Sequence, residues 1–560
     1  MKIEKIKISN KTVMPFTIPS GIITTEISSL ERIANEIPEV GILTTKSIGP
    51  EPRAGNCEPI LAQYMPDGFI NAVGLTNPGA EEFANKLSSI NFPETKFLLA
   101  SIFGKDADEF VYVAKTLENS GKIDGFELNL SCPHAKGLGM QLGQDPDKVA
   151  EITKSVSQIT KKPIFAKLTP NTNNIGEIAK SAISAGAYGI TAINTVGPEY
   201  YSVDGHPVLT NQVGGLSGAG ILPIGLKRVR DIRNAVGENI PIIGMGGIAK
   251  PKDVREYAAA GANIFGIGSA LAGMDENNLR EYFSSLVDCI NNPDESKEWR
   301  LESSLNDFSD KSNEKMKYRK VTIKEKNDSA SDFKILKTNE FIRGESGQFV
   351  FAWIPGIGEK PFSIMDNNPL TLGILEKGEF TKAINSLKPG DSFYVRGPYG
   401  KSYSLDYLSK MDHVLVGGGC GIAGISLMAK SFSDEISQAC DSKLKILLAA
   451  KDKEHIFDLK IRYKEDTEIY IATEDGSRGI KGKVIDLFEK AAIRNGSYFF
   501  NCGPKAMIDA ILPLEMNYSN PEKIFSSVDY MTRCGMGICG SCANEKGQRT
   551  CVEGPFVNNI

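Results

Sequence analysis

Four of the ten cysteines gather near the end of the chain. Cys534, Cys539, Cys542 and Cys551 follow the pattern C-x4-C-x2-C-x8-C, with glycines interleaved. This spacing is typical of plant-type [2Fe–2S] proteins, in which glycines let backbone N–H groups turn toward the cluster sulfurs. A structural zinc site is the alternative, but zinc sites usually place close cysteine pairs at both ends. The tail therefore predicts a [2Fe–2S] cluster.

A fifth cysteine, Cys132, ends the β-rich run GFELNLSC, in which Asn129 also stands. The proline that follows predicts the end of a strand, so the thiol is expected to face an open loop region. A cysteine serves as a general base when its neighbours draw down the pKa of the thiol. Lys46 and Lys167 are candidates for that influence, and the sequence leaves open which of them acts.

Lys46 and Lys167 also suit a flavin. Both stand between apolar residues, in LTTKSIG and FAKLTP, which predicts that they are buried. A positive charge near flavin N1 and O2 stabilises the negative charge that hydride uptake leaves there. Gly246–Gly247 and Gly268–Ser269 end two further β-rich runs, where a phosphate group can approach the backbone. Together these residues predict one bound FMN.

Three asparagines on different loops predict a neutral, polar binding face. They are Asn71, Asn129 and Asn194. A side-chain amide donates and accepts hydrogen bonds at once, so it matches the edge of a ring that carries carbonyl and N–H groups. From the residues alone, the ligand is a small polar heterocycle or acid.

The second half carries signals for a second flavin and a dinucleotide. The run HVLVGGGCGIAGISL passes through Gly419, Gly421 and Gly424 into a helical pattern, which suits a pyrophosphate at a helix N-terminus. A cluster transfers single electrons and needs partners that also handle pairs, as flavins do. A soft thiol at Cys502 ends another strand-like run and suits a nicotinamide. A second flavin and a nicotinamide dinucleotide are therefore predicted, with candidate flavin contacts at Lys360, Pro361, Phe362, Ser363 and Thr381.

Eight β-rich runs, each followed by a helix-like stretch, must position the candidate FMN and substrate residues of the first half. They cover 15–21, 41–49, 96–104, 125–132, 163–170, 189–196, 241–247 and 264–270. Eight parallel strands with intervening helices predict a closed (β/α)8 barrel, whose functional groups lie where the strands end. Further on, short alternating strands predict a small antiparallel β-barrel, and alternating strands and helices predict a nucleotide-binding α/β domain.

The fold class is therefore α/β, in five segments. They are an FMN-binding barrel at 1–290, a linker or connecting helix at 291–317, an FAD-binding β-barrel at 318–405, an NAD-binding domain at 406–520 and a [2Fe–2S] segment at 521–560. Lys and Arg number 64 against 69 Asp and Glu, so no overall positive field attracts nucleic acid or an anionic membrane. With no long apolar run and no secretory signal at its start, the chain is expected in the cytoplasm.

Several motifs resemble one family of flavoenzymes. They are NAVGLTNPG (71–79), ELNLSCPH (127–134), AKLTPN (166–171), AINT (192–195), GGLSG (214–218), GMGGI (244–248) and GIGSA (266–270). With the terminal cysteines, they resemble the NAD-dependent class 1 dihydroorotate dehydrogenases, fused to their ferredoxin reductase-like electron-transfer subunit. The resemblance covers about 1–300 and 318–560.

The resemblance implies a reaction of pyrimidine (UMP) synthesis. Cys132 would remove the C5 proton of dihydroorotate while hydride leaves C6 for flavin N5, and electrons would pass from FMN through [2Fe–2S] and FAD to NAD⁺. The implied FMN contacts are Ser20, Lys46, Ser47, Asn129, Lys167, Ile193, Gly218, Gly246, Gly247, Gly268 and Ser269. The implied substrate contacts are Lys46, Asn71, Ala72, Val73, Gly74, Leu75, Asn129, Asn194 and Thr195. Barrels of this family usually pair, so a homodimer is expected.

Three features depart from the family pattern. Ser101 stands where the family often has an asparagine that touches FMN, and Lys360 replaces the usual arginine of the FAD site. An ammonium group cannot make the forked contact of a guanidinium. The third departure is the fusion itself. Two alternatives stay open, which are a dihydropyrimidine dehydrogenase-type flavoenzyme and an electron-transfer flavoprotein with a different external acceptor.

Overall fold

A computed structural model of the chain describes residues 1–130, 139–328, 330–404, 411–436, 442–457, 459 and 467–558. The chain divides into two compact units. The first comprises Met1–Glu314 and Met536–Gly547, and the second comprises Lys315–Gly535 and Gln548–Ile560. The residue boundaries of the five segments expected from the sequence remain predictions.

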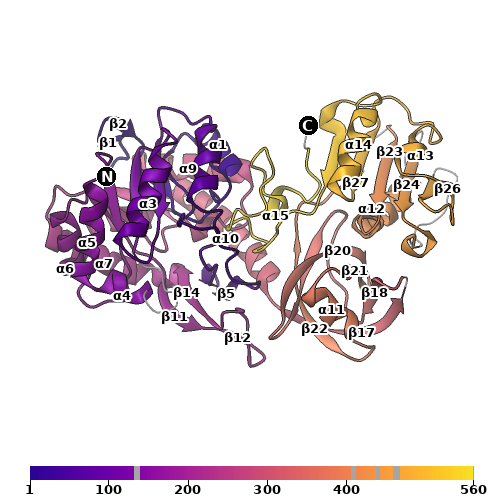
Figure 1. The fold of residues 1–560 in the computed structure, drawn as a ribbon, viewed down its shortest axis with the longest axis horizontal. Coiled ribbons are helices and arrows are strands. Elements are labelled where there is room, and N and C mark those ends of the chain that lie inside the picture. The colour runs from indigo at the N-terminus through magenta and orange to yellow at the C-terminus, as the bar shows by residue number, and fades with distance from the viewer. Residues whose placement is uncertain are drawn as a thin grey trace. The chain divides into compact units, whose positions relative to one another are not determined.

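Eight parallel strands of the first unit close into a barrel (Figure 1). In order around the barrel they are β3 (Phe16–Ile18), β4 (Val40–Thr44), β7 (Phe97–Ile102), β8 (Gly125–Asn129), β9 (Ile164–Lys167), β10 (Gly189–Ala192), β15 (Ile242–Met245) and β16 (Ile264–Gly266). Seven strands fall within the predicted runs, and β4 begins one residue before its run of 41–49, so the (β/α)8 prediction is confirmed. These strands are apolar on both faces because both are buried, as in β7, where all six residues are buried.

Helices follow the strands and turn one apolar stripe inward. Among the described residues, nine α-helices precede residue 292. They are α1 (Ile27–Glu36), α2 (Ala80–Ser88), α3 (Ala107–Glu118), α4 (Gly139–Gln144), α5 (Pro146–Ser157), α6 (Ile175–Ser184), α7 (Leu222–Val236), α8 (Pro251–Ala259) and α9 (Glu276–Asn291). Helix α3 begins where the Asp106 carboxylate accepts a hydrogen bond from Glu109 N. Its buried residues include Phe110, Val113 and Leu117, which share one face.

The barrel interior is packed rather than open. Side chains of Phe97, Leu99 and Phe165 form one cluster with Ile8 and Val13. The last two belong to the hairpin of β1 (Ile6–Ile8) and β2 (Lys11–Val13). This hairpin lies at the amino ends of the strands, where Ser9 N donates to the hydroxyl of Tyr188, just before β10. The carboxyl ends are thereby left for function.

An antiparallel sheet that the sequence analysis did not predict extends from the loops after β4 and β10. Its order is β11 (Val196–Tyr200), β14 (Val213–Gly218), β6 (Gly68–Asn71) and β5 (Leu61–Met65). Strand β14 pairs with β6 so that Gly215 lies opposite Asn71. A small hairpin of β12 (Ser202–Val203) and β13 (His206–Pro207) follows β11. The sheet therefore carries Asn71, a predicted substrate contact.

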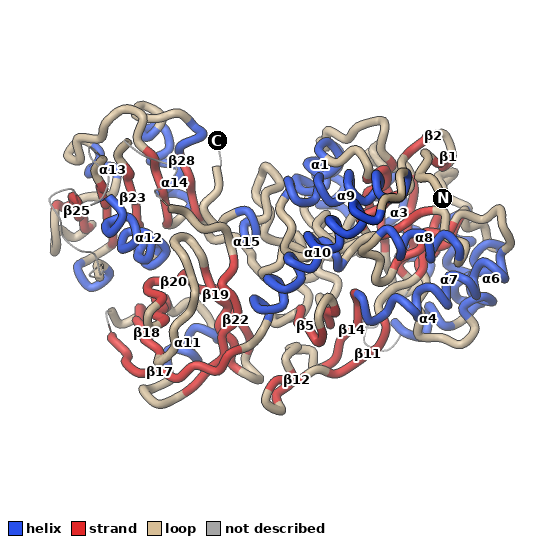
Figure 2. The backbone as a smooth tube through the Cα atoms, turned by 180° about the vertical axis from the view of Figure 1, so that it is seen from behind, coloured by secondary structure: helices blue, strands red, loops and turns tan. Residues whose placement is uncertain are grey.

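The charged stretch after α9 forms α10 (Glu295–Met316), in agreement with the connecting helix expected there. In the second unit, six antiparallel strands close a small barrel, as predicted (Figure 2). In order they are β17 (Arg319–Asp328), β18 (Phe333–Thr338), β21 (Leu370–Leu375), β20 (Gly358–Asn367), β19 (Phe349–Ile354) and β22 (Ser392–Tyr399). Helix α11 (Glu379–Ser386) follows β21.

A six-stranded parallel sheet completes the second unit. Its order is β26 (Ile480–Lys481), β25 (Thr467–Thr473), β24 (Leu444–Ala450), β23 (His413–Gly418), β27 (Tyr498–Cys502) and β28 (Ile524–Ser527). The helices are α12 (Gly421–Ile436), α13 (Ile485–Phe488), α14 (Lys505–Glu515) and α15 (Thr550–Glu553). Among the described residues, no helix is both long and apolar enough to cross a membrane.

Candidate active site

Polar side chains meet at the carboxyl ends of four neighbouring barrel strands. Ser47 lies at the centre of this group, since its Oγ is 3.0 Å from Ser20 Oγ and 2.9 Å from Ser101 Oγ. Asn129 Nδ2 donates to the same Ser47 oxygen over 3.0 Å. The structure therefore brings together three predicted FMN contacts, and Ser101, which replaces the family's usual asparagine, joins them.

A buried ion pair lies beside this group. Lys167 Nζ is 3.4 Å from Glu127 Oε1, and both side chains are less than 10% exposed. Ser101 donates to the same Glu127 oxygen over 3.1 Å. Glu127 was not among the predicted site residues. Its position two residues before Asn129 on one strand was the available signal, because alternate residues share a face.

Lys46 lies two residues after the end of β4 and is 9% exposed, which confirms that it is buried. A β-carbon placed on Gly21 would lie 3.0 Å from Lys46 Nζ, and Gly21 has a φ of +79°. The glycine thus lets the ammonium group approach the backbone next to Ser20. Two buried cations, Lys46 and Lys167, are therefore available at this end of the barrel.

A glycine-lined cradle forms after β15. Gly246 and Gly247 both have positive φ, and a β-carbon on Gly247 would lie 2.9 Å from the carbonyl oxygen of Gly218. A β-carbon on Gly246 would lie 3.2 Å from Ile193 Cγ1. The hydroxyl of Tyr257 donates to Gly246 O over 2.8 Å and fixes the loop from behind. Backbone without side chains is what a phosphate group needs for close approach.

The predicted substrate residues lie around the antiparallel sheet. Asn71 Nδ2 donates to Gly215 O over 3.1 Å, and a β-carbon on Gly215 would overlap Thr195 Oγ1. Asn194 Oδ1 accepts from Thr195 N over 2.9 Å. Gly215 therefore links the Asn71 loop, which continues through Ala72, Val73, Gly74 and Leu75, with Thr195. Cys132 lies outside the described residues, so its role remains a prediction.

One segment of the cysteine tail packs with the first unit. Ile23 N donates to Ile538 O over 2.6 Å, and Gly273 N donates to Met536 O over 2.8 Å. Ile23 follows Ser20 by three residues, and Gly273 follows Ser269 by four. The loop 536–547 is thus docked on the segments after β3 and β16 that carry predicted FMN contacts.

The four tail cysteines are all buried. Cys539 and Cys542 belong to the first unit, whereas Cys534 and Cys551 belong to the second. Within the described part of the chain, no three His, Cys, Asp or Glu side chains form a metal-ion site. The cluster therefore remains a prediction from spacing.

In the second unit, the predicted glycine turn joins β23 to α12. A β-carbon on Gly424 would lie 2.5 Å from Cys502 Sγ and 3.5 Å from Ser363 Oγ. Gly419 has positive φ, and a β-carbon on Gly421 would overlap the Cys502 carbonyl. The structure thus gathers residues of the predicted FAD and NAD contacts.

The other predicted FAD contacts are arranged differently. Lys360 is exposed, whereas Pro361 and Phe362 are half-buried, and the Phe362 ring stacks on Phe380. The Thr381 hydroxyl accepts from Gly378 N over 2.9 Å, as a cap of α11. Thr381 therefore has a structural role, and its contact with FAD remains a prediction.

A buried carboxyl, Glu515, gives the second unit a testable pH dependence. Its Oε2 accepts from Asn501 Nδ2 over 2.9 Å, and burial raises the pKa of Glu515 to about 8. Folding therefore takes up a proton between pH 4.5 and 8, and the unfolding free energy falls as pH rises, by at most about 1.4 kcal/mol per pH unit.

In Glu515→Gln, the unfolding free energy is expected not to fall with pH in this way. The denaturant midpoint of the variant should therefore rise relative to that of the wild type between pH 5 and 8. Denaturant unfolding at several pH values measures the difference. Asp509→Asn, an exposed carboxylate change on the same helix, serves as the control. Parallel pH profiles for wild type and Glu515→Gln would contradict the assignment.

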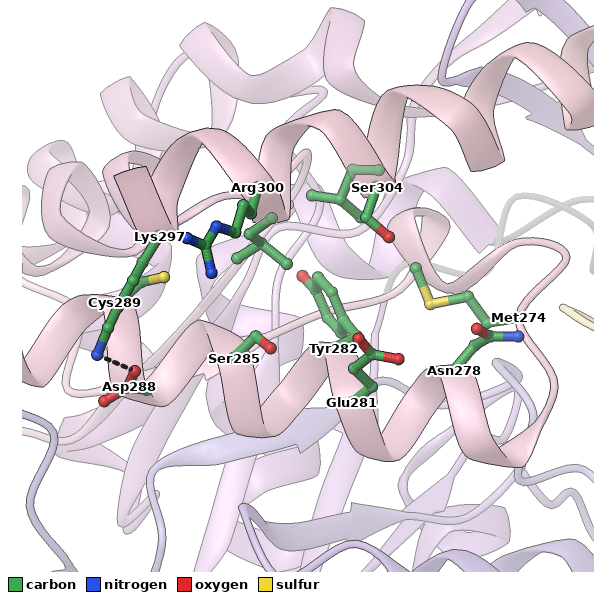
Figure 3. A pocket seen from close by; sticks show the side chains of 12 residues that line it. Met274, Asn278, Glu281, Tyr282, Ser285, Asp288, Cys289, Lys297, Arg300 and Ser304 are labelled. Carbon is green, nitrogen blue, oxygen red and sulfur yellow. Dashed lines mark hydrogen bonds and ion pairs between the residues drawn. The ribbon is translucent and has the colours of Figure 1, made fainter. Parts of the chain in front are cut away.

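A separate cavity of about 320 Å³ lies between α9 and α10 (Figure 3). Its wall carries Glu281 and Asp288 together with Lys297 and Arg300. Lys297 Nζ is 2.7 Å from Asp288 Oδ2. Two acidic and two basic side chains line the cavity, so it favours neither an anionic nor a cationic ligand. None of the predicted site residues lines it.

Comparisons with known proteins match the first half of the chain. A sequence model of the dihydroorotate dehydrogenase family matches residues 4–282. The catalytic subunit of dihydroorotate dehydrogenase B (NAD(+)) from Pyrococcus horikoshii is 43% identical over 293 residues, which cover 49% of this chain and 92% of that protein. The same subunit from Methanocaldococcus jannaschii is 42% identical over 261 residues, 46% of this chain and 83% of that protein. The match to the Thermoplasma volcanium subunit is 40% over 272 residues, with 48% and 87% covered.

Proposed function

This chain belongs to the dihydroorotate dehydrogenase family, and on that basis we propose how its two units share one reaction. The first unit oxidises dihydroorotate to orotate, a step of pyrimidine synthesis, and the second transfers the electrons to NAD⁺. The observation that carries the proposal is the group around Ser47, because it joins predicted flavin contacts at the carboxyl ends of the barrel strands.

The residues present fit FMN. The glycines at 218, 246 and 247 leave backbone open for a phosphate, and Lys46 and Lys167 supply buried positive charge for a reduced flavin ring. When bound, FMN accepts the hydride from C6 of dihydroorotate. The proposed holding set is completed by Ser20, Ser47, Asn129, Ile193, Gly268 and Ser269.

The chain's own residues bind the substrate and move one proton. We assign Cys132 as the base that takes the proton from C5, with the amides of Asn71, Asn129 and Asn194 holding the ring. The loop from Ala72 to Leu75 and Thr195 complete the substrate face. Because these amides carry no charge, they match the carbonyl and N–H edges of the ring.

We further propose a relay of FMN, a [2Fe–2S] cluster and FAD that ends at NAD⁺. The tail cysteines would hold the cluster, and the docking of loop 536–547 on the segments after β3 and β16 supports a short path from FMN. FAD and NAD would use Lys360 to Ser363, Thr381 and the turn at Gly419, Gly421 and Gly424. We also expect a homodimer in the cytoplasm.

The test is anaerobic mixing of the reconstituted chain with dihydroorotate and one acceptor. The proposal expects equal amounts of orotate and NADH with NAD⁺, and slower turnover with NADP⁺, fumarate or quinone analogues. Oxidation of another dihydropyrimidine in preference to dihydroorotate would favour the dihydropyrimidine dehydrogenase alternative. Preference for an acceptor other than NAD⁺ would favour the alternative of an electron-transfer flavoprotein with a different external acceptor.

Tyr257→Phe is expected to weaken FMN binding roughly three- to tenfold. The change removes one buried hydrogen bond to Gly246 O, a loss of about 0.5–1.5 kcal/mol. Titration of apoprotein with FMN, followed by flavin fluorescence, measures the dissociation constant. Tyr188→Phe, which removes a hydroxyl at the opposite end of the barrel, is the control. An unchanged dissociation constant for Tyr257→Phe would show that the cradle does not depend on this bond.

A further inference from the structure

A buried carboxylate, Glu127, lies inside the barrel of the first unit, next to its apolar core. On β7 the inward positions change from Leu99 to the polar Ser101. On β9 they change from Phe165 to Lys167. Strand β8 lies between these two strands, and its Glu127 side chain is 1% exposed. Water hardly reaches this carboxylate, so protein groups must balance its charge.

The groups that balance it are Lys167 and Ser101. Lys167 Nζ lies 3.4 Å from Glu127 Oε1, and Ser101 Oγ donates to the same oxygen over 3.1 Å. Glu127 Oε2 is buried and has no hydrogen-bond partner among the described residues. Because a buried ion pair is often no more stabilising than apolar packing, the stability of the fold alone gives no reason for this pair.

The carboxylate also fixes the direction of the hydrogen bonds that lead to the predicted FMN contacts. An ionised carboxylate only accepts, so the single hydroxyl proton of Ser101 points to Glu127. Ser101 Oγ must then accept from Ser47 Oγ, which lies 2.9 Å away. With its own proton used in this way, Ser47 accepts from Asn129 Nδ2 over 3.0 Å and from Ser20 Oγ over 3.0 Å. One charge inside the barrel thus orders the hydroxyl groups at the carboxyl ends of the strands.

We propose that Glu127 is a positioning residue of the flavin site, which holds the Lys167 ammonium group and lowers the reduction potential of the bound FMN, an inference that rests on the proposed FMN site. Reduction leaves negative charge on the flavin ring, and the cation of Lys167 stabilises that charge. The Glu127 carboxylate opposes this effect, because its negative charge lies next to the same ammonium group. The potential therefore depends on the net charge of the pair rather than on the lysine alone.

The test is a redox titration of the full chain, reconstituted with one equivalent of FMN and no FAD, so that the absorbance of a single flavin is followed. Glu127→Gln removes the negative charge and keeps the shape of the side chain. Its potential is expected to rise by about tenfold in the ratio of reduced to oxidised flavin, which is about 30 mV for a two-electron couple. Glu127→Asp keeps the charge and should shift the potential less. Ser101→Ala removes a hydrogen bond that partly neutralises the carboxylate, so its potential is expected to fall by a smaller amount.

Asp124→Asn is the matched control, because Asp124 immediately precedes β8 and pairs with Lys11 over 2.7 Å at the amino end of the barrel. It should lower the stability of the unit without moving the potential. A wild type that binds no FMN, or whose flavin absorbance does not respond to orotate, would reject the proposed function.

A wild type that binds FMN and responds to orotate allows the role of Glu127 to be judged separately. An unshifted or lowered potential in Glu127→Gln would overturn that role alone, as would equal shifts in Glu127→Gln and Glu127→Asp. If Glu127→Gln does not fold, an unshifted potential in Ser101→Ala would overturn it.

Discussion

Cys132→Ser is expected to slow the reduction of FMN by dihydroorotate about a hundredfold to ten-thousandfold. A serine hydroxyl is a far weaker base than a thiolate, and loss of a positioned general base typically costs that factor. Lys46 and Lys167 remain in the variant, so orotate binding should change little. Stopped-flow absorbance of the flavin after anaerobic mixing with dihydroorotate measures the rate.

Two comparisons separate this effect from misfolding. NADH should still reduce the second unit of Cys132→Ser at the wild-type rate, because that reaction does not involve the barrel. Cys57→Ser, at an exposed cysteine of the first unit, should leave both rates unchanged. Rapid FMN reduction in Cys132→Ser would remove the assignment of the base.

Cys539→Ser is expected to reduce NADH formation from dihydroorotate to below about one hundredth of the wild-type rate. The change replaces one of the four proposed cluster ligands, and serine rarely substitutes for a thiolate in such clusters. Dihydroorotate should nevertheless bleach the FMN in a single turnover, since the reaction at the barrel needs no cluster. Iron content and steady-state NADH absorbance provide the measurements.

A buried cysteine outside the proposed ligand set is the proper control. Cys289 on α9 is 2% exposed and lies in the first unit. Cys289→Ser should keep its iron and its rate of NADH formation. Wild-type NADH formation by Cys539→Ser would mean that electrons leave the barrel by another route.

The eight barrel strands were predictable because strands buried on both faces are continuous apolar runs that end in polar or glycine residues. The sheet of β5, β6, β11 and β14 was not predictable from the sequence. Strand β14 has the sequence VGGLSG and β11 has VGPEY, and such glycine- and proline-containing segments are typical of loops. Their strand conformation depends on pairing with each other, which single-segment patterns do not report.

At the site, the predicted flavin serines and Asn129 do meet, but their link to Lys167 through Ser101 and Glu127 was not predicted. Ser101 appeared only as a departure from the family pattern, and Glu127 was passed over as part of a motif. The structure shows that Ser101 bridges Ser47 and Glu127. Such a network depends on which strands are neighbours, and this information is tertiary.

The docking of loop 536–547 on the barrel has a consequence for biosynthesis. In the sequence, most of the second unit lies between the barrel and this loop, which belongs to the first unit. A nascent barrel on the ribosome must therefore wait, with the surface around Ile23 and Gly273 uncovered, until almost all of the message has been translated. If the gene were split at the connecting helix, the loop would belong to the second product, and the barrel would acquire it only when the two products associate.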